Sequence, residues 1–256
     1  MIEKVTLVGA GNLATQLGKA LKMAGVSISQ VYSRTEKSAS ELANLLECPF
    51  TTSLSSLIMC DLVIVSVKDD ALEDVLSQLK RTAVVVHTSG SIPMEIFEGH
   101  FEQFGVFYPL QTFSKQRDVD FSTIPICIES SSPELLEELT QLGNQLSNTV
   151  EHINSEKRKT LHLAAVFTCN FVNHFYQIGN ALLEEQELNF DLLKPLIQET
   201  AQKVMHLDPI DAQTGPAVRF DETIINKHLN LLSDKPELKK IYNFVSENIY
   251  QTKNRS

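Results

Sequence analysis

One short motif near the N-terminus constrains the fold of this 256-residue chain more than any other feature. Four strand-forming residues, Val5 to Val8, run directly into the glycine-rich turn Gly9 to Ala14. A Gly-x-Gly-x-x-Ala turn of this kind allows a tight bend, a close backbone approach to a pyrophosphate and close packing of helix on strand. The unpaired N–H groups at the helix N-terminus then bind the phosphates. The motif predicts a dinucleotide site that is contacted by Gly9, Gly11, Asn12 and Leu13.

The residues after the turn complete a β-α-β unit. Apolar residues recur at helical spacing from Leu13 to Ala24, and Gly25 ends the predicted helix. Residues 28–32 then have the character of a second strand. A β-α turn that binds nothing is the alternative interpretation, but every part of the dinucleotide fingerprint is present and in order.

The end of the second predicted strand indicates which dinucleotide is held. NAD sites place an acidic residue there for the ribose 2′-hydroxyl, whereas NADP sites offer an arginine to the 2′-phosphate. This chain has Ser33, Arg34 and Thr35 at that place, and the first acid after the strand is Glu36. A guanidinium and two hydroxyls suit a phosphate dianion. We therefore expect NADP(H) rather than NAD, with an ordinary exposed arginine as the alternative.

Composition excludes several other classes of protein. Hydrophobic residues make up 43% of the chain, enough for a packed core, and 22 basic against 32 acidic residues give a net charge of −10. We expect no nucleic-acid partner, because phosphate neutralisation would dominate its affinity. The apolar stretches are too short or too interrupted to cross a bilayer. Because Met1 to Lys4 lead directly into the first predicted strand, we expect no signal peptide. The four cysteines are scattered and no metal-ligand spacing occurs, so we expect a cytoplasmic protein without a metal.

The pattern of strands and helices changes near residue 153. Up to that point apolar strands alternate with helices, and the continuous apolar run at 61–67 is typical of a parallel strand covered on both faces. Beyond it we predict only helices, at 156–185, 191–206, 221–232 and 236–250. The expected fold is α/β, with a doubly wound parallel sheet in residues 1–153 followed by an all-α domain in residues 154–256.

Ligands of open parallel sheets bind at the carboxyl ends of the strands, so the residues that follow the predicted strands are candidates for a site. Ser66, Val67 and Lys68 are expected to line the cofactor. Thr88 and Ser89 are expected to contact the nicotinamide or the substrate. The alternative is that any buried strand must end in polar loop residues.

Two histidines are candidate proton donors. His87 has a side chain whose ordinary pKa suits proton transfer near neutrality, or it is a hydrogen-bonded histidine at a strand end. His162 and Asn170 lie eight residues apart on one face of the long predicted helix, where buried polar groups need partners. We expect both to contact substrate; a satisfied core histidine and a helix-packing asparagine are the alternative. Cys169 is placed where a catalytic thiol could act.

The segment Thr214-Gly215-Pro216 interrupts the predicted helices and leaves Arg219 and Asp221 before the next helix start. Arg219 could bind a substrate carboxylate bidentately, which would make the substrate anionic. The alternative is a surface pair in which Asp221 caps the helix.

These motifs together resemble a bacterial family of Rossmann-like proteins that carry a C-terminal domain of unknown function numbered 2520 and are described as NADP oxidoreductases. The resemblance covers nearly the whole chain and implies NADP(H) as the cofactor. The segments that carry it are Val8 to Ala14, His87 to Gly90, Tyr108 to Phe113, His162 to Asn170, and Thr214 to Asp221.

The layout is similar, more distantly, to pyrroline-5-carboxylate reductase, ketopantoate reductase and the 6-phosphogluconate and 3-hydroxyacid dehydrogenases. That resemblance implies a helical domain like the C-terminal domain of 6-phosphogluconate dehydrogenase, which often builds a homodimer, and a substrate cleft between the domains. The hydroxyacid dehydrogenases carry a catalytic lysine about one turn before an asparagine. This chain has Val166 four residues before Asn170, so the role of that lysine does not transfer.

Two functions of different class are compatible with these features. The first is an NADP(H)-dependent oxidoreductase that moves hydride between nicotinamide and a small C=O or C=N substrate. In it, His162 or His87 donates a proton, Asn170 and Ser89 orient the substrate, and Arg219 binds an anionic group. The second is a dinucleotide-binding sensor or regulatory dimer without redox turnover, which the missing lysine favours.

Overall fold

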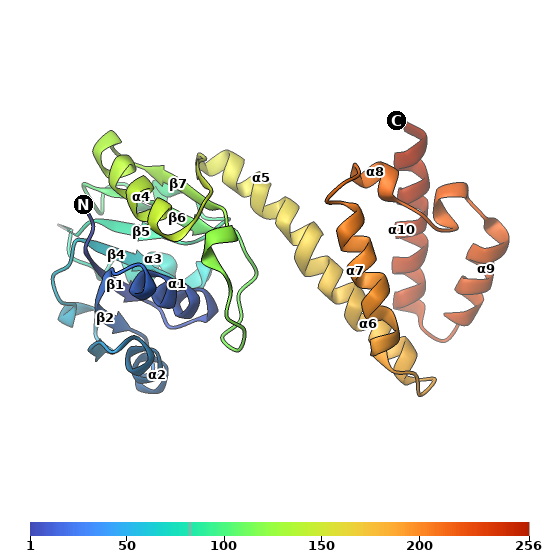
Figure 1. Cartoon of the computed structure of the whole chain (residues 1–256), viewed down its shortest axis with the longest axis horizontal. Helices are drawn as coiled ribbons and strands as arrows, with labels where there is room; N and C mark the ends of the chain where they lie inside the picture. The colour runs from blue at the N-terminus through green and yellow to red at the C-terminus, as the bar shows by residue number, and fades with distance from the viewer. Residues whose placement is uncertain (82, 256) are drawn as a thin grey trace. The chain divides into compact units, whose positions relative to one another are not determined.

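The structure, a computed structural model, describes residues 1–81 and 83–255. The chain divides into two compact units, Met1–His174 and Phe175–Ser256 (Figure 1). The division falls after His174 rather than after the predicted residue 153. The reason is that the first part of the long helix packs with the α/β unit.

The first unit is built on one eight-stranded sheet in the order β3-β2-β1-β4-β5-β6-β7-β8. This is the doubly wound order with two further strands at one edge, and the predicted fold class is confirmed. One detail differs from an all-parallel sheet: β7 runs antiparallel to β6. The segment between them contains a short 3-10 turn, Phe121–Thr123, instead of the crossover helix that parallel neighbours need. The strands are β1 Lys4–Val8, β2 Ser27–Tyr32, β3 Phe50–Thr51, β4 Leu62–Val65, β5 Val85–His87, β6 Phe104–Pro109, β7 Ile126–Ser130 and β8 Val150–His152.

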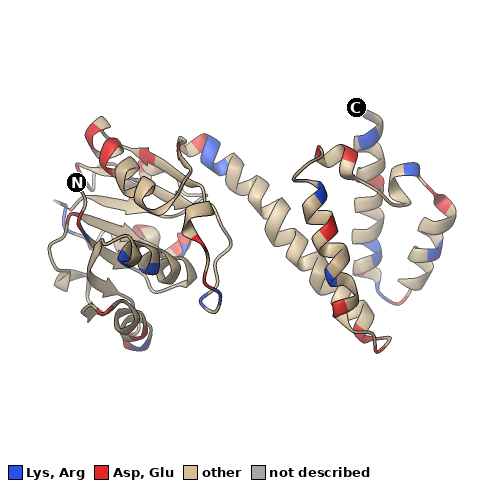
Figure 2. Ribbon diagram, in the orientation of Figure 1, with Lys and Arg blue, Asp and Glu red and all other residues tan. Residues whose placement is uncertain are grey.

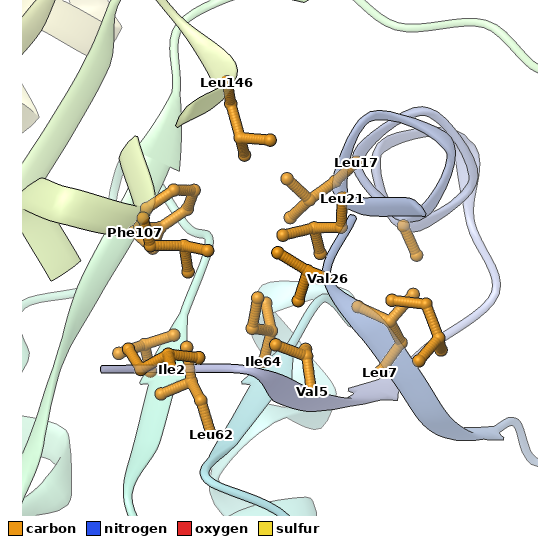
Figure 3. Packing of buried hydrophobic residues seen from close by; sticks show 14 of the residues in the cluster. Ile2, Val5, Leu7, Leu17, Leu21, Val26, Leu62, Ile64, Phe107 and Leu146 are labelled. Atoms are coloured by element: carbon orange, nitrogen blue, oxygen red, sulfur yellow. The ribbon is translucent and has the colours of Figure 1, made fainter. Parts of the chain in front are cut away.

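Both faces of this sheet are buried. Alternate residues of β4 contribute to two separate cores, with Leu62 and Ile64 in one and Val63 and Val65 in the other. Helices α1 Asn12–Met23, α2 Glu36–Leu46 and α4 Pro133–Leu146 cover the first face, where Leu17 and Leu21 of α1 pack toward the sheet (Figure 3). The short helix α3 Leu72–Leu76 and the 3-10 turn Met94–Phe97 cover the second. The apolar strands are thus buried on both sides, as their composition predicts.

Two of the connections between strands in this unit begin with a 3-10 turn. The stretch after Ser53 forms only the 3-10 turn Leu54–Ser56. The stretch after Lys68 begins as the 3-10 turn Asp69–Ala71 and becomes helical only at α3.

The described residues from Ser155 onward form no strand, as predicted. The long helix is divided into α5 Ser155–Ala165, a π-helical turn Val166–Phe171 (η5) and α6 Val172–Glu184. The remaining helices are α7 Lys194–Lys203, α8 Pro209–Ala212, α9 Glu222–Leu231 and α10 Pro236–Arg255, with 3-10 turns at Phe190–Leu193 and Ala217–Arg219. None of the helices in the described part of the chain is long and apolar enough to span a membrane.

A buried ion pair fixes the start of α5 on the sheet. Arg158 is fully buried, and its guanidinium pairs with Glu129 of β7. The same guanidinium donates to the carbonyl of Ile92 at 2.8 Å and to Ser155 Oγ at 3.1 Å. Ser155 in turn donates to Glu129 from its backbone N–H at 2.9 Å and from its hydroxyl at 2.7 Å. One strand, one loop and one helix N-terminus are therefore joined through a single polar cluster, and this cluster explains why α5 belongs to the α/β unit.

We predict that Arg158→Met lowers the free energy of unfolding by about 3–5 kcal/mol, because it leaves the Glu129 carboxylate buried without its partner. Urea unfolding of the full chain, followed by circular dichroism, measures the change. Lys159→Met is the matched control: Lys159 is next in sequence and makes an exposed ion pair with Glu156, so its loss should cost less than about 1 kcal/mol. Adding Glu129→Gln to Arg158→Met should recover part of the loss. Equal losses in Arg158→Met and Lys159→Met would contradict the prediction.

Candidate functional site

The glycine turn is held between the ends of two strands. Gly9 has φ +124°, and a Cβ built on it would lie 2.1 Å from the carbonyl oxygen of Ser66. Its backbone N–H donates to the carbonyl of Tyr32 at 2.8 Å. Since β2 ends at Tyr32 and Ser66 follows β4, no residue with a side chain can replace Gly9 without moving one of these strand ends.

The N-terminus of α1 is open to an anion. Gly11 is the N-cap, no side chain caps the helix, and its first turn carries no acid. A Cβ on Gly11 would meet no atom within 4 Å. The first N–H groups of the helix therefore have neither a capping oxygen nor a repelling carboxylate, which is the arrangement that binds phosphate.

A pocket of about 220 Å³ lies beside this turn. Its only charged lining groups among the described residues are Arg34 and Lys68, in a protein of net charge −10. The pocket favours an anionic ligand, because two cations face it and no acid does. We call it the nucleotide pocket, and its lining residues are Gly9, Ala10, Gly11, Tyr32, Ser33, Arg34, Ser38, Ser66, Val67, Lys68, Ala71 and Val75.

The structure thus brings together seven of the predicted cofactor residues, namely Gly9, Gly11, Ser33, Arg34, Ser66, Val67 and Lys68. The other four lie outside the lining. Asn12 donates from Nδ2 to the carbonyl of Phe113 at 3.1 Å, and Leu13 packs against the core. Thr35 is the N-cap of α2, where its hydroxyl donates to Ser38 Oγ at 2.9 Å. Thr88 is buried, and its N–H donates to the carbonyl of Val65 at 3.1 Å.

His87 is buried at the end of β5. Its Nδ1 accepts from the N–H of Ser89 at 3.1 Å, and its ring stacks on Phe97 with centroids 5.3 Å apart. Nε2 has no hydrogen-bond partner among residues 1–81 and 83–255. Burial, followed by the positive charge of Arg158, lowers the pKa of His87 to about 3. The side chain is therefore neutral near neutrality and holds the Ser89 turn, which makes it a poor proton donor.

Ser89 closes the turn after β5. Its hydroxyl oxygen accepts from the N–H groups of Ser91 at 3.2 Å and Ile92 at 3.0 Å. Ser91 donates its own hydroxyl proton to Asp69, which follows Lys68 in the loop after β4. These bonds tie the β5 loop to the loop that supplies Lys68 to the nucleotide pocket. Ser89 Oγ also lies 3.4 Å from Ser91 Oγ, and because Ser91 donates its proton to Asp69, Ser89 is the donor in this contact.

Gly90, Tyr108 and His162 meet at one point, which we call the Gly90 cluster. Tyr108 Oη lies 3.0 Å from His162 Nδ1. A Cβ on Gly90 would lie 2.5 Å from His162 Nδ1 and 2.8 Å from the tyrosine ring. The three residues come from the β5 loop, β6 and α5, so a glycine is needed where the imidazole and phenol rings approach the loop.

The π-helical turn interrupts the helical spacing on which the prediction for Asn170 rests. The turn spans Val166–Phe171, so an unbroken α-helix does not connect His162 with Asn170. Asn170 is exposed, and its side chain makes no hydrogen bond within the described part of the chain. Cys169 is also exposed, with Thr168 Oγ1 at 3.9 Å from its sulfur. π-Helical turns occur often at functional sites.

Arg219 lies in the second unit, at the end of the 3-10 turn Ala217–Arg219, and is exposed. Asp221 is the N-cap of α9 and accepts from the N–H of Ile224 at 3.2 Å. The alternative interpretation, in which Asp221 caps the helix and pairs with Arg219, is therefore correct about the cap. Arg219 makes no ion pair with a described residue, so that interpretation is wrong about the pair.

Sequence reasoning missed three residues of this region: Tyr108, Glu129 and Arg158. Tyr108 was named only as the start of the segment Tyr108 to Phe113 that carries the family resemblance. Arg158 lies in a charged run of a kind that usually marks a solvated helix face. Their partners are distant in sequence, so no local pattern identifies them. The one available signal was Asn154, a favourable N-cap residue directly after β8, which places the helix start close to the sheet.

The sheet order, the glycine turn and the cation-bearing pocket define a dinucleotide-binding α/β protein with a helical C-terminal unit. Residues 4–90 match the family described as "NADP oxidoreductase coenzyme F420-dependent", and residues 124–249 match "Domain of unknown function (DUF2520)". The crystal structure of a "putative NADP oxidoreductase" from Bacteroides fragilis is 50% identical to the chain, with a TM-score of 0.92 and 98% of each chain covered. The chain therefore belongs to this family of NADP oxidoreductases with a DUF2520 domain, and the resemblance predicted from the motifs is confirmed.

Two more distant structures share the fold. A 1-pyrroline-5-carboxylate reductase from Streptococcus pyogenes is 15% identical with a TM-score of 0.66, covering 97% of this chain and 98% of its own. An imine reductase from Myxococcus stipitatus, solved with NADP+, is 18% identical with a TM-score of 0.65, covering 98% of this chain and 93% of its own. No curated protein sequence matches the chain.

We predict that His87 makes stability fall with pH below about 6.5. Its pKa is near 6.5 when unfolded and about 3 when folded, so between these values the unfolded state holds the extra proton. The stability is fully present above the unfolded value and is lost as the pH falls toward the folded value. Lowering the pH from 7.5 to 5 should cost the wild type about 2 kcal/mol more than it costs His87→Asn. Urea unfolding at both pH values measures this difference, and identical pH dependences would contradict it.

Proposed function

We propose that the chain binds NADP(H) in the nucleotide pocket and transfers hydride between the nicotinamide and a small C=O or C=N substrate. The observation that carries the proposal is the convergence of the Gly9–Gly11 turn, Ser33, Arg34 and Lys68 on one pocket without an acid. An NAD site would place a carboxylate where Ser33 stands.

The residues present fit the phosphates of this cofactor. The open N-terminus of α1 suits the pyrophosphate, as the missing cap and the missing acid both favour an anion. Arg34 is exposed and unpaired within the described part of the chain, so its five N–H donors are free for the 2′-phosphate. Ser33 and Ser38 line the same pocket and supply hydroxyl donors. The distant imine reductase of the same fold was solved with NADP+, which supports this choice.

NADPH, when bound, supplies the hydride. The protein must then orient the substrate and provide a proton. We assign the proton to His162, because His87 stays neutral and buried. Ser89 orients the substrate with its hydroxyl, which turns away from Ser91 Oγ to do so. Asn170, an exposed amide, contacts the substrate, and Arg219, an exposed cation, binds an anionic part of it. Ser66 and Val67 line the nucleotide pocket and contact the cofactor in this proposal. Thr88, Asn12, Leu13 and Thr35 lie outside that lining, and the last three belong to the helix starts beside it.

A dinucleotide sensor or regulatory protein without turnover is the second candidate. It is favoured by Val166, which lies where the hydroxyacid dehydrogenases carry their catalytic lysine. The two candidates differ in one result, which is whether bound NADPH is consumed.

The experiment is a titration of NADPH and NADH, followed by a screen of keto acids, aldehydes and cyclic imines for NADPH oxidation. We expect NADPH to bind more tightly than NADH. Arg34→Ala should lower the affinity for NADPH by about 10- to 100-fold, because charge-assisted hydrogen bonds to the 2′-phosphate are lost. The affinity for NADH should not change. Fluorescence of the bound nicotinamide measures the affinities.

Lys37→Ala is the matched control, since Lys37 is an exposed cation close in sequence that does not line the pocket. It should leave both affinities unchanged. If NADPH and NADH bind with equal affinity, and Arg34→Ala changes neither affinity, the assignment of Arg34 to the 2′-phosphate is contradicted. Tight NADPH binding without oxidation by any acceptor would favour the sensor.

We also propose that a second copy of the chain covers apolar side chains of the helical region. No Asp, Glu, Lys or Arg occurs between Thr160 and Leu183, so this long stretch is uncharged (Figure 2). Phe167 is 60% exposed on it, and Leu192 and Leu196 are 66% and 62% exposed near the start of α7. Exposed apolar side chains of this size, one in the first unit and two in the second, favour contact with a partner. The wide occurrence of helical dimers in folds of this layout makes a second copy the partner we favour.

We predict a homodimer, with a mass by light scattering of twice the 28.6 kDa of one chain. The double variant Leu192→Glu and Leu196→Glu should weaken the dimer at least about tenfold, since buried interface residues of this size carry much of the affinity. Met23→Glu is the control, because Met23 is 88% exposed on α1 of the α/β unit. A monomeric wild type, or a dimer that both variants leave intact, would contradict the prediction.

A further inference from the structure

The Gly90 cluster contains a histidine whose partner is a buried tyrosine. Tyr108 is 7% exposed near the end of β6, and its hydroxyl lies 3.0 Å from His162 Nδ1. The two rings stand edge to face at 71°, with centroids 6.1 Å apart. Gly90 leaves the space in which they meet. Each polar atom is therefore placed for one hydrogen bond whose direction decides where the imidazole proton sits.

The direction follows from the phenolic proton. Burial, with Cys127 and Cys169 nearby, raises the pKa of Tyr108 to about 12, although the charge of Arg158 acts against this. The tyrosine therefore keeps its proton. Within the described part of the chain its hydroxyl has His162 as its one hydrogen-bond partner. If Nδ1 carried the proton and donated it, the phenolic proton would be buried without an acceptor, which is costly. The phenol must donate, and Nδ1 must accept.

We propose that Tyr108 holds His162 in the tautomer that carries its proton on Nε2, and so makes Nε2–H the group that donates to the substrate. This inference rests on the proposed function and names the atom that acts in it. Tyr108 is a positioning residue in this scheme. It also donates its phenolic proton to Nδ1 of His162 after Nε2 has given up its own.

The proton movements balance without a further reactant. As a substrate C=O gains hydride at carbon, its π electron pair moves to oxygen, which takes the proton from Nε2 of His162. Nδ1 then takes the phenolic proton of Tyr108, and the imidazole stays neutral. The phenolate that remains lies near the Arg158 charge and regains a proton from water. An alkoxide is a stronger base than a phenolate, so the transfer runs toward the product.

The chain contains a second pair of the same kind, which serves as an internal control. His228 Nδ1 lies 2.7 Å from Tyr242 Oη, and the two rings also stand edge to face, at 83°. This pair lies in the second unit, between α9 and α10. Tyr242→Phe therefore removes the same atom from the same kind of contact as Tyr108→Phe does.

The test is ¹⁵N NMR of the full chain labelled at histidine, with His162→Gln and His228→Gln to assign the two signals. We expect His162 Nδ1 to have the chemical shift of an unprotonated nitrogen and Nε2 that of a protonated one. Tyr108→Phe should shift His162 toward a mixture of tautomers and leave His228 unchanged, and Tyr242→Phe should do the reverse. A protonated Nδ1 in the wild type, or a His162 signal that ignores Tyr108→Phe, would overturn the proposal.

Turnover gives a second measurement with any acceptor found to oxidise NADPH. Tyr108→Phe should lower kcat by as much as about 100-fold, because a misoriented His162 transfers its proton more slowly. The affinity for NADPH should not change. His162→Gln should lower kcat by about 10²- to 10⁴-fold. Tyr242→Phe should leave kcat unchanged. Unchanged turnover in Tyr108→Phe would overturn the positioning role. If no acceptor is found, the proposed function fails while the NMR result still decides the tautomer.

Discussion

The ion pair between Arg158 and Glu129 is the interaction on which the rest of the site depends. A buried pair of this kind contributes little net stability compared with an apolar replacement, because both charges lose their hydration. Its effect is geometric: Glu129 accepts three hydrogen bonds from Ser155 and the guanidinium, and the helix can start in one position only. His162 follows Arg158 by four residues, about one turn later on the same face. The position of the imidazole beside Tyr108 is thus set by a contact one turn away.

The nucleotide pocket depends on a different kind of constraint, since its anion-binding groups are mostly backbone. The Gly9 turn is held by a carbonyl of β2 and the approach of Ser66, so its shape follows from the sheet. This explains why so much of it could be predicted. The residues that build it are contiguous, and strand, turn and helix each leave a local pattern in the sequence. Arg34 follows the same logic, because the end of the second strand must lie beside the turn in any sheet of this order.

The rest of the site could not be predicted because it depends on pairs that are distant in the chain. Tyr108 and His162 are 54 residues apart, and Glu129 and Arg158 are 29 apart. A tyrosine near the end of a strand and an arginine in a charged helix start each have a common structural explanation, and nothing local singles them out. The π-helical turn is a similar case. Helical periodicity places His162 and Asn170 on one face, but the periodicity contains no sign that the hydrogen-bonding changes at Val166. The antiparallel direction of β7 was missed because its first three residues, Ile126 to Ile128, form a buried apolar run like those of the parallel strands.

The two halves of the proposed reaction therefore depend on different physical properties of the same unit. In the proposed reaction, cofactor choice is assigned to Arg34, whose side chain is exposed. Proton donation depends on His162, whose orientation is held by a buried phenol and, through α5, by a buried ion pair. A change of cofactor preference can thus occur without loss of the fold, whereas a change at the proton donor must preserve its packed partners. Gly90 adds to this asymmetry, since any side chain there would meet both rings at once. The chemistry of this fold is accordingly harder to alter than its cofactor specificity, because orientation of a donor needs a packed environment and recognition of a phosphate does not.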